Sequence, residues 1–98
     1  MFEWLKSGQK TIDVRKGNAQ QGEFAVFQSG PQVLRIKILK RESGRLEEVL
    51  RSDNFRLVIP SAAVLDNAVG YLRGLYVGYD GVFTAYYLSV GNGDLRKR

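Results

Sequence analysis

One stretch decides the fold class of this chain, and it reads Val33-Leu-Arg-Ile-Lys-Ile-Leu-Lys-Arg-Glu-Ser-Gly-Arg45. It carries five basic side chains against one acid and keeps an apolar residue at nearly every second position. Successive side chains of a strand point to opposite faces of a sheet, so Leu34 and Ile36 face one way and Arg35 and Lys37 the other. The stretch therefore predicts a half-buried strand with one charged face, and a polyanion is the first partner to consider.

Two shorter alternating runs precede the basic strand. In residues 10–16, Ile12 and Val14 fall on one side and polar residues on the other. Residues 23–28 alternate in the same way and end at Ser29-Gly30-Pro31, where glycine and proline interrupt a ladder. Both runs are typical of half-buried strands.

Two further strands are expected after the basic one. Ser43-Gly44 predicts a two-residue hairpin turn, which would set Lys40 opposite Glu47 on a fourth strand. A cluster of turn residues follows, and residues 55–59 then alternate again. This pattern predicts a fifth strand.

The hydrophobic period changes after Pro60. Ser61 can cap a helix whose apolar residues between Leu65 and Leu75 recur at spacings of three and four. Asp80-Gly81 then lies between two alternating apolar runs, which is the pattern of a β-hairpin. The expected fold class is α+β, with a mostly antiparallel curved sheet of about five strands, one helix and a C-terminal β-hairpin. An OB-type barrel is a competing architecture.

Length and charge bound the kind of protein. A chain of 98 residues forms one domain, residues 1–98, and we expect its basic end, residues 94–98, to be disordered. Lysine and arginine number 15 against 10 aspartate and glutamate, which gives a formal charge of +5. Such a surplus favours nucleic acid or an anionic surface as partner, although it also serves solubility alone.

The absence of two residue types narrows the chemistry. Without cysteine the chain has no disulfide and no thiolate, which fits a cytoplasmic location. Without histidine it lacks the commonest general base and zinc ligand. No residue set supplies a base, a nucleophile and an oxyanion site together, so we expect a protein that is not an enzyme, with no cofactor and no metal. No apolar run approaches the roughly 18 residues of a membrane span.

Single-stranded nucleic acid needs cations for its phosphates and aromatic faces for its bases. Both kinds of side chain occur on the predicted strands and at their ends. The candidate nucleic-acid-binding residues are Arg15, Lys16, Phe24, Arg35, Lys37, Lys40, Arg41, Arg45 and Arg56. Arg35 and Lys37 are the favoured phosphate-binding residues, because two neighbouring cations on one sheet face repel each other unless solvent or a bound anion compensates their charge. For the aromatic residues, core packing is the competing role.

The order of several strands followed by an amphipathic helix, with its junction in residues 55–72, resembles the PurA and Whirly group of single-stranded nucleic-acid-binding domains. The resemblance covers roughly residues 10–75. It implies that basic and aromatic side chains of the sheet hold the strand and that helices of two subunits or repeats pack together. The residues that would take the sheet role are Arg15, Phe24, Arg35, Lys37 and Arg56. An extra hairpin strand before the helix and a tyrosine-rich hairpin after it depart from that group.

Two hypotheses follow from the sequence. The first is a non-enzymatic module that binds single-stranded DNA or RNA, as a homodimer that buries the helix face or the final hairpin. The second is a protein-interaction or assembly module, in which edge strands and the tyrosine-rich hairpin recruit another chain by strand addition.

Overall fold

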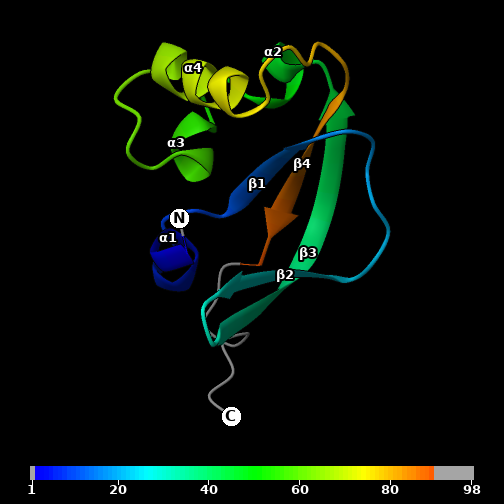
Figure 1. Ribbon diagram of the computed structural model, residues 1–98, viewed down its shortest axis with the longest axis vertical. Coiled ribbons are helices and arrows are strands. Elements are labelled where there is room, and N and C mark those ends of the chain that lie inside the picture. The colour runs from blue at the N-terminus through cyan, green and yellow to red at the C-terminus, as the bar shows by residue number, and fades with distance from the viewer. Residues whose placement is uncertain (1, 90–98) are drawn as a thin grey trace.

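The computed structural model describes residues 2–89, which form an α+β fold around a curved antiparallel half-barrel of four strands (Figure 1). The strands are β1 (Ile12–Lys16), β2 (Phe24–Ser29), β3 (Gln32–Gly44) and β4 (Phe83–Leu88). Their order across the sheet is β1-β4-β3-β2, so the last strand in sequence lies in the middle. The helices in this part of the chain are α1 (Phe2–Ser7), α2 (Leu46–Val49), α3 (Phe55–Val58) and α4 (Leu65–Leu75). The expected fold class is therefore confirmed, while the number and order of its elements differ.

The two faces of the sheet are covered differently. Helices α2, α3 and α4 gather at one end, and the β2–β3 hairpin extends beyond them at the other (Figure 1). The helix-covered face includes the buried residues Ile12, Val14, Phe83 and Ala85. The opposite face of the sheet, which we call the inner face, packs against Leu5 of α1. It includes the buried residues Phe27, Leu34, Ile36, Tyr86 and Leu88. Helices α2, α3 and α4 cover only one end of the helix-covered face. The part of that face formed by the β2–β3 hairpin is therefore exposed to solvent.

The hairpin predicted at Ser43-Gly44 is wrong. Strand β3 continues to Gly44 in pairing with β4, and α2 begins at Leu46. The Glu48 carboxylate folds back and accepts a hydrogen bond from the backbone N–H of Arg45 at 2.8 Å. A Cβ at Gly44 would lie only 2.5 Å from that carboxylate, so the glycine serves a close approach and not a turn. Lys40 consequently pairs with Tyr87 of β4 and not with Glu47.

The strand predicted at residues 55–59 is also wrong, because this segment forms α3. Phe55, Val58 and Ile59 are buried whereas Leu57 is exposed, which is a helical spacing and not an alternating one. The Asn54 side chain precedes the helix, accepting from the backbone N–H of Arg51 and donating to a carbonyl of α2. These bonds turn the chain back on itself, so the short run cannot extend into the sheet.

The predicted helix is present, but it begins after Val64 instead of after Ser61 and continues to Leu75. The predicted C-terminal hairpin is wrong, although its second strand is present as β4, which pairs with β1 and β3. Instead of a strand, the segment after α4 forms a turn in which the rings of Tyr76 and Tyr79 lie edge-on to Phe83, at 5.8 and 5.3 Å between centroids. The basic residues 94–98 lie outside the described part of the chain. None of the helices of residues 2–89 has the length and apolar character needed to cross a bilayer.

Candidate nucleic-acid interface

The exposed side of the β2–β3 hairpin brings several predicted site residues together. In the register of this hairpin Phe24 pairs with Lys37 and Val26 with Arg35, so their four side chains share one face. The opposite side chains of both strands point into the core of the inner face. We call this exposed surface the basic hairpin face, and its members are Phe24, Val26, Val33, Arg35, Lys37 and Lys40.

Lys40 joins this face because of an irregularity in β3. Ile38 pairs with Leu88, but the next pair toward the strand end is Lys40 with Tyr87, so the register shifts between them. The extra residue in this bulge reverses the alternation that precedes it. As a result Lys40 and Lys37 share a face, and the Lys40 ammonium lies 4.6 Å from the centre of the Tyr87 ring.

The cations of the basic hairpin face have no carboxylate partner within residues 2–89. In this part of the chain, the ion pairs involve Lys10, Arg15, Arg51 and Arg73. The Arg35 guanidinium lies instead over the Phe24 ring, 4.3 Å from its centre, and both residues are exposed. This contact orients the guanidinium while leaving its charge uncompensated. The face therefore presents a row of unneutralised cations beside an exposed aromatic ring.

Two other predicted site residues lie on the inner face, where they bind the protein itself. Arg41 donates hydrogen bonds to the carbonyls of Gln20 and Gly22, and so holds the loop that connects β1 to β2. The Arg15 Nε donates to the Asp13 carboxylate at 2.5 Å. The charge of Arg15 is thus compensated by Asp13, whereas Arg41 keeps its charge but its guanidinium is held by the two carbonyls.

The remaining predicted residues are dispersed. Lys16 lies at the end of β1 with its ammonium 5.3 Å from the centre of the Tyr79 ring. Arg45 precedes α2. Arg56 lies on α3 and donates to the carbonyl of Ala63 at 2.9 Å. Thus Phe24, Arg35, Lys37 and Lys40 are brought together, and the other candidates are not.

A buried charge cluster that the sequence did not single out lies beside β1. The Lys10 ammonium donates to the carbonyls of Ile12 and Val58, at 2.9 and 2.7 Å, and lies 3.8 Å from the Asp13 carboxylate. The Lys10 side chain is only 4% exposed and that of Asp13 is 10% exposed. Burial lowers the pKa of Lys10 below its ordinary value, although Asp13 opposes this effect. The ammonium joins β1 to α3, so its role is structural.

The lowered pKa makes the stability of the protein depend on pH through Lys10. The unfolded chain binds this proton more tightly than the folded chain, so the buried ammonium costs stability below the folded pKa. As pH rises from the folded pKa toward the ordinary value, that cost disappears. We therefore expect the unfolding free energy of the native protein, relative to Lys10→Met, to rise over the pH range just below the ordinary lysine pKa of about 10.4. Urea unfolding of both proteins measures it, and a constant difference across this range would contradict the assignment.

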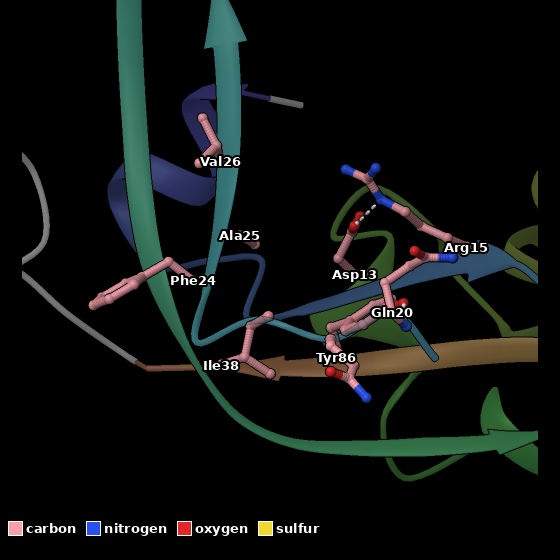
Figure 2. A pocket seen from close by; sticks show the side chains of 9 residues that line it. Asp13, Arg15, Gln20, Phe24, Ala25, Val26, Ile38 and Tyr86 are labelled. Atoms are coloured by element: carbon pink, nitrogen blue, oxygen red, sulfur yellow. Dashed lines mark hydrogen bonds and ion pairs between the residues drawn. The ribbon is translucent and has the colours of Figure 1, made fainter. Parts of the chain in front are cut away.

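A small pocket opens between the two outer strands (Figure 2). Its volume is about 150 Å³, and Asp13 and Arg15 of β1 line it opposite Ala25 and Val26 of β2. Figure 2 shows the ring of Phe24 directed away from Asp13 and Arg15. Sites for drug-sized ligands are usually larger, about 300 Å³ or more, and here the two charged groups neutralise each other. The basic hairpin face is therefore the better candidate for a functional site.

No protein family model, no curated protein and no solved structure matches this chain.

Proposed function

We propose that this protein binds single-stranded nucleic acid, without catalysis, on the basic hairpin face. One observation carries the proposal: Arg35, Lys37 and Lys40 share an exposed face with Phe24 and have no carboxylate partner among residues 2–89. A row of like charges is destabilised by mutual repulsion unless counterions or phosphates neutralise it. An extended polyanion with stackable bases supplies both kinds of contact.

The geometry of the hairpin favours a single strand over a duplex. Alternate residues on one face of a strand are about 6.6 Å apart, so the cations form a line along β3 that an extended backbone can follow. Phe24 lies beside this line with its side chain exposed, where an unpaired base can stack on it. The bases of a duplex already stack on one another, so they would leave the ring unused. The proposed binding therefore combines phosphate contacts with stacking.

Fluorescence anisotropy with a labelled single strand of about 20 nucleotides tests the proposal, at several salt concentrations and beside a duplex of the same sequence. We expect a dissociation constant in the micromolar range at low salt and weaker binding to the duplex. Three phosphate contacts per chain predict a slope of about −2 in a plot of log affinity against log salt. Absence of binding at low salt, or a preference for the duplex, would overturn the proposal.

The cellular location is part of the same proposal. A cysteine-free chain functions in a reducing compartment without loss of stability, so we place this activity in the cytoplasm. Retention of the protein on immobilised oligonucleotide from a cytoplasmic extract is the corresponding measurement.

A further inference from the structure

Strand β2 lies at one edge of the sheet, and that edge is unprotected. Its residues, Phe24–Ser29, include no charged side chain and no proline, and its pairing with β3 has no bulge. Natural proteins normally protect an outer strand with one of these devices, because its free N–H and C=O groups can pair with another chain. The composition of β2 is therefore typical of a strand whose free edge pairs with another strand.

The direction of the backbone groups follows from one hydrogen bond. The N–H of Ile38 donates to the carbonyl of Glu23 at 2.8 Å, and pairs bonded in this way recur at every second residue of an antiparallel ladder. Ala25 and Phe27 accordingly bond to β3. The N–H and C=O groups that point to the free edge belong to Phe24, Val26 and Gln28. The side chains of these three residues are all exposed, so the free edge is accessible from solvent.

The other outer strand, β1, is less suited to pairing. It carries three charged residues, Asp13, Arg15 and Lys16. The carbonyl of Ile12, one of the backbone groups on that edge, already accepts a hydrogen bond from the Lys10 ammonium. A helix lies beside each outer strand, α3 beside β1 and α1 beside β2, but Ile12 and Val14, whose backbone groups point to the free edge of β1, are buried. Of the two outer strands, β2 alone combines an uncharged sequence with a reachable edge.

We propose that β2 pairs antiparallel with β2 of a second copy of this chain, across a two-fold axis at Val26. In this register Val26 of one chain lies directly opposite Val26 of the other, and Phe24 of each chain lies opposite Gln28 of the other. The three pairs form about six main-chain hydrogen bonds. An identical strand is a suitable occupant because β2 carries no charge, so no like charges face each other directly across the new strand pair, and the cations of each β3 lie one strand further out. Val26 and Phe24, which are 58% and 39% exposed, gain cross-strand contacts.

This pairing bears on nucleic-acid binding, a consequence that rests on the proposed function. Two antiparallel strands joined edge to edge are related by an axis perpendicular to the sheet, so equivalent faces of the two copies lie on the same side. The two basic hairpin faces then form one continuous surface, with the cations of one β3 on each side of the new strand pair. A single strand of nucleic acid can therefore contact both copies.

Sedimentation velocity on the full chain tests the pairing, with two variants of one residue. Val26→Pro removes an N–H that points to the free edge and costs no bond to β3. Val26→Lys places like charges directly opposite each other at the axis. The matched control is Val33→Lys, which adds the same charge to an exposed valine of the same face on β3. Circular dichroism checks that each variant is folded.

We expect the native protein and Val33→Lys to sediment with twice the mass of one chain, and both Val26 variants with the mass of one chain. A native protein that stays monomeric at about 100 µM would overturn the pairing, since a stable dimer forms far below that concentration. Folded Val26 variants that remain dimeric would overturn it too. A dimer that binds no oligonucleotide would leave the pairing intact and refute only the proposed function.

Discussion

Replacing Asp13 by alanine is expected to lower the unfolding free energy by about 3 kcal/mol. The Asp13 carboxylate is the counter-charge of the buried Lys10 ammonium and accepts the hydrogen bond from Arg15. The other partners of Lys10 are two carbonyls, which are neutral. Removal of the carboxylate thus leaves a buried charge uncompensated, and this is far more costly than loss of a surface ion pair. Urea unfolding followed by circular dichroism measures the change.

Two further proteins separate this effect from a general effect of losing a carboxylate. Asp80→Ala removes an equal charge from an exposed loop and should change the unfolding free energy by less than about 0.5 kcal/mol. The double variant Lys10→Met/Asp13→Leu removes both buried charges and should recover about half of the loss or more. If the double variant is less stable than Asp13→Ala, the interaction of Lys10 with the carbonyls of Ile12 and Val58 outweighs the charge pair. That result would contradict the expected order.

Two of the strands that sequence analysis identified correctly, β1 and β3, alternate apolar and polar side chains over at least five residues. Strand β2 has four consecutive apolar residues, 24–27, and is marked mainly by the glycine and proline that bound it, and β4 was predicted from an apolar run after Asp80-Gly81. The run at residues 55–59 alternates equally well, but Phe55, Val58 and Ile59 also have helical spacing. A short apolar run satisfies both periods, and the hydrogen bonds of Asn54 decide between them. Such a tertiary contact is invisible in the sequence.

Long-range pairing was the other feature that the sequence could not provide. Asp80-Gly81 has the composition of a hairpin turn, yet β4 pairs with β1 and β3, which are far away in the chain. Local turn signals say nothing about such partners. The exposed face of Arg35 and Lys37 was predicted from alternation alone. The position of Lys40 beside them depends on the bulge after Ile38, whose only sequence signal is the end of the alternation there.

The double variant Arg35→Ala/Lys37→Ala is expected to lose most of the salt-dependent affinity for single-stranded nucleic acid. Each alanine removes one phosphate contact, so the magnitude of the salt slope should fall by about 1.4. Two solvated contacts together contribute about 1.4 kcal/mol, which is a tenfold loss of affinity. Both side chains are exposed, and neither forms an ion pair with another residue of the described chain, so folding should be nearly unaffected. A double variant that unfolds would show that the assignment of the faces is wrong.

The control for charge is Arg56→Ala/Arg73→Ala, which removes two exposed cations from α3 and α4. If affinity depends only on the net charge of the chain, this control will bind as weakly as the Arg35 and Lys37 variant. If the basic hairpin face binds the phosphates, the control will keep a slope close to that of the native protein. The comparison therefore separates a defined site from general attraction of a cationic protein for a polyanion.

Phe24→Ala completes this test because it removes a ring without removing charge. Base stacking contributes about 1–3 kcal/mol for each aromatic ring, so its loss should weaken binding by roughly fivefold or more while the salt slope stays unchanged. The two variants of the hairpin thus differ in which quantity they alter, slope or intercept. Arg35 lies over the Phe24 ring, so the triple variant should lose less affinity than the sum of the two losses. Full additivity would contradict a ring and a guanidinium that act together on the same strand.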